Sequence, residues 1–101
     1  MHPNGKIFPV KLASGQTVYA KVLSHWHRTV AFVNPNESKK WLDIANAPAG
    51  DMIIPSLIRC RGMNYRVSEI DSNAFNGCSN LTHLIIPEGI KRIGWGAFGA
   101  C

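Results

Sequence analysis

The first half of the chain alternates apolar and polar residues in the way that strands do. Residues 6–24, KIFPVKLASGQTVYAKVLS, alternate on both sides of the turn sequence ASGQ, which predicts a hairpin. TVAFVNP (29–35) predicts a further strand. NESKKWLDIANA (36–47) places Trp41 and Ile44 at helical spacing, which favours a short helix. We therefore expect a β-rich unit in this half, where no repeat is visible.

The second half contains two copies of one pattern. With the last two cysteines aligned, VSEIDSNAFNGC (67–78) lies over IKRIGWGAFGAC (90–101), so that apolar, small and cysteine positions match while polar positions differ. Upstream of them, MIIP (52–55) lies over LIIP (84–87). The first copy is longer because it contains an insertion around RCRGMNYR, with Gly and Asn near its middle. This insertion, over 56–66, predicts a β-hairpin.

The sequence from residue 50 onward resembles the BspA-type leucine-rich repeats of bacterial surface proteins. Their pattern is roughly C-x-x-L-x-x-I-x-I-P-x-x-[VI]-x-x-I-G-x-x-A-F-x-G-C, and members often open with Y-x-V-x-x-I, as YRVSEI does here. The resemblance implies a β-rich α+β repeat fold, a short right-handed leucine-rich-repeat solenoid of 23-residue coils with parallel strands. Residues 50–101 would form two such repeats, the first with the hairpin insertion. Residues 1–49 would form a β-hairpin-rich N-terminal cap over the open end.

Two positions depart from the family pattern. Asp71 stands where glycine is usual, and Ala100 replaces the glycine before the last cysteine. We expect Asp71 and its equivalent, Gly94, to turn the chain with positive φ, a state that Gly adopts freely and Asp tolerates. SNAFNGC (72–78) predicts a single helical turn that drives Phe75 inward.

Exposed residues on the strand face are candidates for a binding site. By the two-residue alternation of a strand, the first coil presents Asp51 and Ile53 on this face, and the second presents His83 and Ile85. The two isoleucines would form an apolar stripe of the kind that repeat sheets present to protein partners. The alternative is that the N-terminal cap covers them.

Further candidates lie on the second face and on the turn after it. Glu69 should lie beside Arg92 as a cross-strand ion pair. Trp95 should be exposed on a turn, as an interface anchor or as an ordinary surface residue. The complete set of candidate protein-binding residues is Asp51, Ile53, His83, Ile85, Lys91, Arg92 and Trp95.

The cysteines and histidines form no recognisable catalytic or metal-binding motif. Cys78 and Cys101 occupy equivalent positions, so a disulfide between stacked coils is conceivable, whereas the resemblance favours unpaired buried thiols. Cys60 lies in the insertion, where an exposed thiol would join two molecules. HWH (25–27) offers two imidazoles, too few to hold a metal without other ligands. We expect no enzymatic activity, no metal and no cofactor.

The composition is that of a soluble globular domain, with 46% hydrophobic and 17% charged residues. No apolar run approaches the roughly 18 residues of a membrane helix, so we expect no membrane insertion. The net charge of +5 comes mainly from the first half and is not clustered as in a nucleic-acid-binding protein. It favours acidic partners over nucleic acid.

The resemblance implies a non-enzymatic protein-binding or adhesion module at the cell surface or outside the cell. Its partner would be a host extracellular-matrix protein or a bacterial surface protein. No signal sequence is visible in the chain, so the localisation depends on the resemblance. The alternatives are a structural spacer or cap in a larger surface protein and, more weakly, a polyanion-binding protein. We also expect a homodimer through the exposed edge of the C-terminal coil, 79–101.

Overall fold

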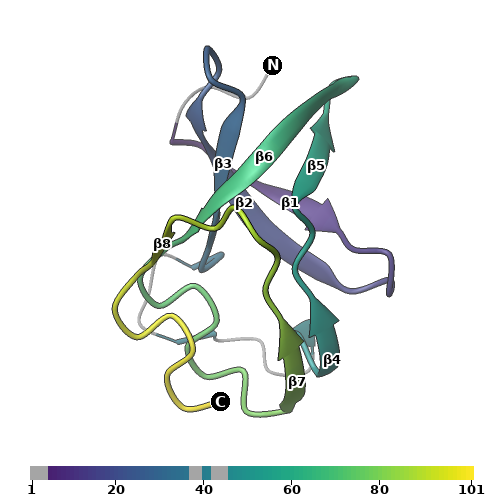
Figure 1. Ribbon diagram of the computed structural model, residues 1–101. Coiled ribbons are helices and arrows are strands. Elements are labelled where there is room, and N and C mark those ends of the chain that lie inside the picture. The colour runs from purple at the N-terminus through teal and green to yellow at the C-terminus, as the bar shows by residue number, and fades with distance from the viewer. Residues whose placement is uncertain (1–4, 37–39, 42–45) are drawn as a thin grey trace.

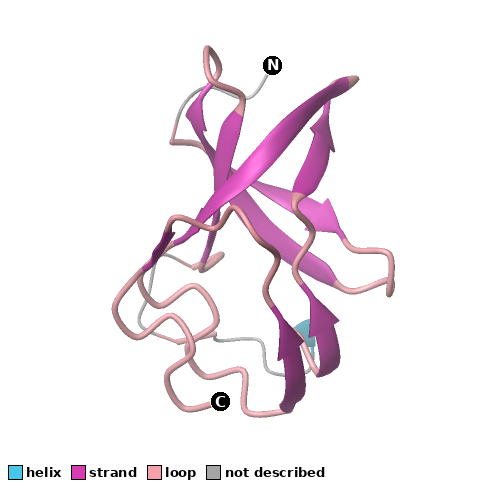
Figure 2. Cartoon of the chain, in the orientation of Figure 1, coloured by secondary structure: helices cyan, strands magenta, loops and turns pink. Residues whose placement is uncertain are grey.

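The structure, a computed structural model, describes residues 5–36, 40–41 and 46–101. None of these residues lies in an α-helix, and strands and loops make up nearly all of the described chain (Figure 2). The strands follow one another along the chain (Figure 1) as β1 (Ile7–Lys11), β2 (Thr17–Ser24), β3 (Thr29–Val33), β4 (Gly50–Ile53), β5 (Leu57–Cys60), β6 (Met63–Ile70), β7 (Leu81–Ile85) and β8 (Arg92–Ile93).

Six strands form one mixed sheet. Its order is β1-β2-β3-β6-β5, and β8 also pairs with β6. The neighbours are antiparallel except for β3–β6 and β6–β8, which are parallel. The sheet curls into a half-barrel, with β1 and β5 at the ends of the strand order (Figure 1). β4 and β7 form a separate two-stranded parallel sheet.

The predicted solenoid, a β-rich α+β fold of parallel strands, is wrong. The architecture is nearly all β, and its main sheet is mixed. The physical reason is that β6 has the antiparallel strand β5 as a neighbour, where a solenoid coil has parallel neighbours on both sides. β3 pairs directly with β6, with Phe32 opposite Ile70, so the N-terminal strands continue the sheet instead of covering the end of a solenoid.

The alignment of the two copies nevertheless predicts several residue pairs of the structure. Ile70 lies opposite Ile93 in the β6–β8 pair. In β4–β7, Ile53 lies opposite Ile85, as the alignment of MIIP with LIIP requires. The repeat is therefore visible as local parallel pairing within a different overall architecture.

The predicted helical turn over 72–78 is wrong. This segment is a run of turns, in which the amide of Ala74 donates to the carbonyl of Asp71 and the amide of Cys78 donates to that of Phe75. The amides of Asn73, Phe75 and Gly77 donate to the second copy of the repeat, for example from Phe75 to the Ala97 carbonyl at 2.8 Å. Phe75 is fully buried, which confirms its predicted inward position.

Asp71 and Gly94 do not have the positive φ predicted for them. Positive φ occurs two residues later in each copy, at Asn73 (60°) and Gly96 (68°). Gly94 is required for another reason. A Cβ atom at this position would collide with the backbone nitrogen of Ser72 and lie 2.7 Å from its Cα. The two copies therefore approach each other too closely for any side chain at residue 94.

One apolar core joins the two halves of the chain. Phe32 of β3 packs edge-on against Phe75, at 6.3 Å between ring centroids. The indole Nε1 of Trp41 donates to the carbonyl of Ala74 at 2.8 Å. Both the sheet and the core cross the predicted boundary after residue 49, and the division into two parts stays a prediction. The helix predicted over 36–47 lies largely outside the described residues.

Candidate protein-binding surface

The β4–β7 pair presents two isoleucines to solvent. Alternation along β4 buries Met52 in the core and leaves Asp51 and Ile53 exposed. Ile53 and Ile85 lie opposite each other and are 63% and 58% exposed. The prediction that they lie side by side at the surface is confirmed, and no described residue of the N-terminal half covers them. The two strands border a shallow hollow of about 380 Å³.

A polar pair lies next to the isoleucines. Nδ1 of His83 lies 2.8 Å from Oδ1 of Asp51, and the hydroxyl of Thr82 donates to the same oxygen at 3.3 Å. The side chains of Asp51 and His83 are both nearly four-fifths exposed. Because water surrounds this pair, its net stabilising effect on the fold is small. Its polar groups remain within reach of a partner that docks on the isoleucines.

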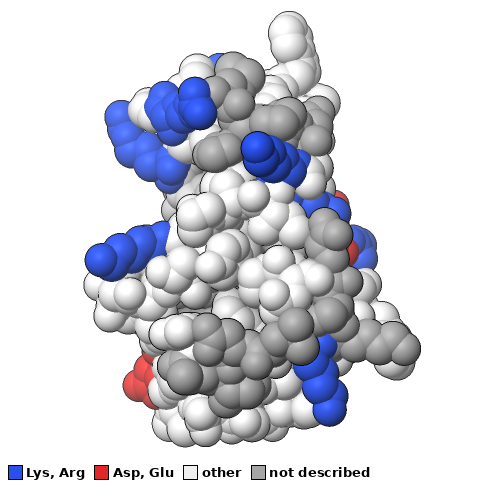
Figure 3. Space-filling view, turned by 180° about the vertical axis from the view of Figure 1, so that it is seen from behind, with Lys and Arg blue, Asp and Glu red and all other residues white. Residues whose placement is uncertain are grey.

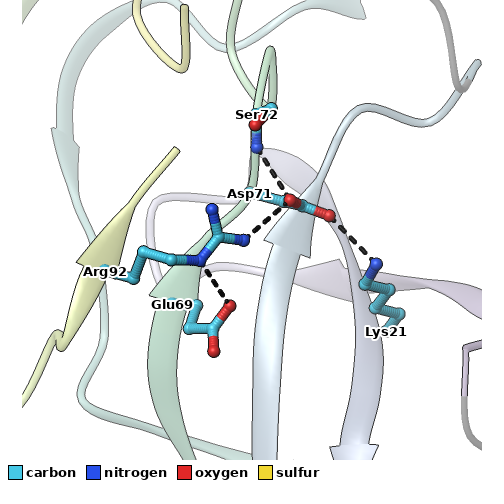
Figure 4. A network of polar contacts seen from close by, with 5 residues as sticks. All are labelled: Lys21, Glu69, Asp71, Ser72 and Arg92. Carbon is cyan, nitrogen blue, oxygen red and sulfur yellow. Dashed lines mark hydrogen bonds and ion pairs between the residues drawn. The ribbon is translucent and has the colours of Figure 1, made fainter. Parts of the chain in front are cut away.

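Arg92 belongs to a different group of residues, which holds the two repeats together (Figure 4). Nε of Arg92 lies 3.0 Å from Oε1 of Glu69, so the predicted Glu69–Arg92 pair is confirmed. Nη2 of Arg92 lies 3.0 Å from Oδ1 of Asp71, whose Oδ2 lies 3.0 Å from Nζ of Lys21. The network links β8 to β6, to the residue after β6, and to β2 of the N-terminal half.

Asp71 is the centre of this network. Partial burial favours its protonated form, but hydrogen bonds from Lys21, the Ser72 amide and Arg92 outweigh burial, so the pKa of Asp71 is lowered. The bond to Glu69, followed by that to Asp71, raises the pKa of the Arg92 guanidinium. An aspartate at the usual glycine position therefore has a structural role, and Arg92 is engaged with two carboxylates.

The predicted site residues do not form one patch. Asp51, Ile53, His83 and Ile85 lie on β4–β7, whereas Lys91, Arg92 and Trp95 lie on or beside β8, well apart from β4–β7 in Figure 1. Trp95 is 82% exposed, as predicted, and Lys91 is also exposed. Trp26, in the turn after β2, is 89% exposed and was not among the predicted residues.

Sequence reasoning also missed a groove of about 620 Å³ between β1 and β5. Residues 8–14 line one wall and residues 57–61 the other, and Asp51 and Ile53 connect it to the β4–β7 hollow. Residues of β5 alternate between exposed and buried in the structure, but the sequence LIRC does not alternate apolar and polar residues. Nothing in the sequence indicated that this strand faces β1 across a gap.

All three cysteines are free. Cys60 is buried, so the expectation of an exposed thiol in the hairpin is wrong. Cys78 is buried too, and burial, together with the nearby Cys101, raises the pKa of its thiol to about 12. Cys101 is exposed, and its thiol donates to the Phe75 carbonyl at 3.3 Å. The resemblance favoured buried, unpaired thiols at both repeat positions. Both thiols are unpaired, but only Cys78 is buried.

The two histidines of HWH have different partners. Nδ1 of His25 lies 2.7 Å from the Tyr65 hydroxyl, and Nδ1 of His27 lies 3.1 Å from the Ser24 hydroxyl. Within residues 5–36, 40–41 and 46–101, no three His, Cys, Asp or Glu side chains are grouped so that they could hold a metal ion. In the same residues, no helix is long and apolar enough to cross a membrane.

The fold and this surface define a nearly all-β protein built partly from two paired copies of one repeat. Residues 58–101 match the family described as BspA type Leucine rich repeat region (6 copies). The match confirms the resemblance for this part of the chain, while residues 1–57 lie outside it. Neither the curated proteins nor the solved structures gave a significant match.

Proposed function

We propose that the protein is a non-enzymatic protein-binding or adhesion module, at the cell surface or secreted, that binds through the β4–β7 surface. The observation that carries the proposal is the exposed pair Ile53 and Ile85, which lie opposite each other on adjacent strands. Exposed apolar groups rimmed by polar ones are typical of protein interaction sites, and Asp51 and His83 form such a rim here. The family match supports a surface-associated repeat protein.

The proposed partner is a host extracellular-matrix protein or a bacterial surface protein, with no nucleic acid and no membrane insertion involved. The main alternative is a structural spacer or cap with no ligand of its own. A polyanion-binding role has less support. In Figure 3 the Lys and Arg side chains are spread over several places on the face shown, although they cover much more of it than Asp and Glu do.

The test is a solid-phase assay in which the purified protein is applied to a panel of extracellular-matrix proteins. Ile85→Asp should weaken binding about tenfold or more, because burying an isoleucine contributes about 1.5–3 kcal/mol. Ile93→Asp is the matched control, since Ile93 is another exposed isoleucine but lies on β8, beside Trp95. Circular dichroism checks that both variants fold.

The outcomes separate the functions. If Ile85→Asp lowers binding and Ile93→Asp does not, the β4–β7 surface is supported. The reverse result would move the site to Lys91, Arg92 and Trp95. If no matrix or bacterial surface protein is retained, the spacer function is favoured. Polyanion binding weakens steeply with salt, so weak retention on heparin disappears at physiological salt. Retention that persists at physiological salt would favour a polyanion-binding function.

We also propose a homodimer through residues 79–101. β7 and β8 each pair with one described strand only, and Ile93 and Ile86 are exposed beside their free edges. Free edges and exposed apolar residues favour pairing with a second copy. A mass twice that of the chain by light scattering would support the dimer, and a monodisperse monomer at high concentration would contradict it.

A further inference from the structure

The groove between β1 and β5 separates two strand edges that have no described partner. β1 and β5 lie at the ends of the strand order and are not hydrogen-bonded to each other. Residues of both strands line the groove. An unpaired edge exposes a row of amide and carbonyl groups to which another extended chain can bind.

The hydrogen-bond register shows which groups of β5 point into the groove. The amide of Val67 donates to the carbonyl of Ser56 at 2.9 Å, in the same register that pairs Ile58 with Tyr65. Because residues of an antiparallel pair alternate, Ser56, Ile58 and Cys60 bond toward β6. The amide and carbonyl groups of Leu57 and Arg59 therefore point away from β6, toward the free edge.

The edge of β1 is less suited to pairing. The amide of Leu12 donates to the carbonyl of Gln16, so the even-numbered residues of β1 bond toward β2. The outward residues are Ile7, Pro9 and Lys11, and Pro9 has no amide hydrogen to donate. Proline at an edge is a common protection against strand addition. An added strand would therefore pair with β5, with its other edge toward β1 and its side chains alternating between the two faces of the sheet.

The charges around the groove indicate the chemistry of the occupant. Its described lining contains three basic side chains, Lys11, Arg59 and Arg61, and a single acidic one, Asp51, which is already paired with His83. Apolar residues such as Val10, Ile53 and Leu57 make up much of the remaining wall. An extended segment that alternates acidic and apolar residues is complementary to both features.

We propose that the β5 edge binds an extended, acidic peptide segment of a partner protein as an additional strand. This inference goes beyond the proposed function, because it depends on the backbone of Leu57 and Arg59 and not on Ile85. The β5 strand is short, so the segment would gain few backbone hydrogen bonds. The basic side chains would then contribute much of the selectivity for acidic sequences.

The test uses a blocked synthetic peptide of alternating glutamate and valine, titrated into the full chain and followed by amide NMR. A peptide of alternating lysine and valine is its control. Arg59→Pro removes the outward amide and the charge, whereas Arg59→Ala removes the charge alone and keeps the amide. The Arg59 amide points away from β6, so proline there leaves the β5–β6 hydrogen bonds in place.

We expect the acidic peptide to bind, to shift the amide signals of residues 57–61 and to slow hydrogen exchange at Leu57 and Arg59. Arg59→Pro should weaken binding about five- to tenfold, as expected for a lost backbone hydrogen bond. Arg59→Ala should weaken it only about two- to threefold, and Ile85→Asp not at all. The two proposals can therefore fail separately. The proposed function fails if Ile85→Asp does not weaken matrix-protein binding, and this inference fails if the acidic peptide does not bind at Leu57 and Arg59.

Several results would overturn the inference. Equal effects of Arg59→Pro and Arg59→Ala would mean that charge alone attracts the peptide. Equal binding of the lysine peptide, or heparin binding tighter than the acidic peptide at the same residues, would also contradict it. If Arg59→Pro does not fold, hydrogen exchange in the unmodified protein decides, because unchanged exchange at Leu57 and Arg59 in saturating peptide excludes strand addition.

Discussion

Gly94 marks the closest approach between the two copies of the repeat, and replacing it with alanine should be strongly destabilising. The new Cβ would collide with the Ser72 backbone nitrogen and lie 2.7 Å from Ser72 Cα. Carbon atoms in contact prefer about 3.5–4.0 Å, so the two segments would have to separate by roughly 1 Å. The atoms in the way belong to the backbone and cannot rotate aside.

The magnitude follows from the bonds near this contact. Overpacking of this kind costs about 1–3 kcal/mol. Two hydrogen bonds flank the contact, from the Gly94 amide to the Ile70 carbonyl at 2.7 Å and from the Asn73 amide to the Trp95 carbonyl at 3.1 Å. Each contributes about 0.5–1.5 kcal/mol, which gives a total loss of about 2–6 kcal/mol. Since small domains are stable by about 5–15 kcal/mol, this loss is a large fraction.

Urea unfolding followed by circular dichroism measures the loss of unfolding free energy. In thermal unfolding, Tm should fall by about 8 °C or more. Two glycines serve as controls. Gly99 lacks a positive φ, and a Cβ there lies no closer than 3.3 Å to its neighbours, so Gly99→Ala should be mild. Gly89 has φ +94° in open space, so Gly89→Ala tests conformational strain alone, about 1–2 kcal/mol. A loss in Gly94→Ala no larger than that in Gly89→Ala would refute the close-approach argument.

Two further predictions concern titration and reactivity. The lowered pKa of Asp71 means that its contribution to stability is present above the unfolded pKa, near 3.8, and is lost as the pH falls through the folded value. The difference in unfolding free energy between the unmodified protein and Asp71→Asn should therefore shrink below about pH 4, and a constant difference would contradict the network. A maleimide at neutral pH should label Cys101 alone, because Cys60 and Cys78 are buried, and all three should react in urea. Labelling of Cys60 in the folded protein as fast as that of Cys101 would contradict its burial.

The part of the fold predicted from the sequence is the part that repeats. Aligning the two copies placed Ile53 beside Ile85 and Glu69 beside Arg92, because residues at equivalent positions pair in parallel. Their exposure followed from the two-residue period of a strand. The alignment also located Gly94 correctly but for the wrong reason, since glycine can serve either positive φ or close approach and a sequence does not distinguish the two.

The sequence pattern did not predict the half-barrel or its groove. The insertion predicted a hairpin, but the pattern did not indicate that β3 would pair with β6. The groove brings residues 8–14 against residues 57–61, and such non-local contacts depend on the curl of the whole sheet. Asp71, taken as a turn residue, proved to join three elements, because Lys21 lies on β2, far from it in the chain.

The two proposed binding surfaces meet at Ile53, which lines both the β4–β7 hollow and the β1–β5 groove. Ile85 lines only the first, and Arg59 lines only the second. One substitution at the shared residue should therefore affect both ligands, whereas each of the others should affect one. If Ile53→Asp weakens matrix-protein binding and acidic-peptide binding together, Ile53 contributes to both surfaces, as its position between them requires. If Ile53→Asp weakens binding of only one of these two ligands, the two surfaces act independently.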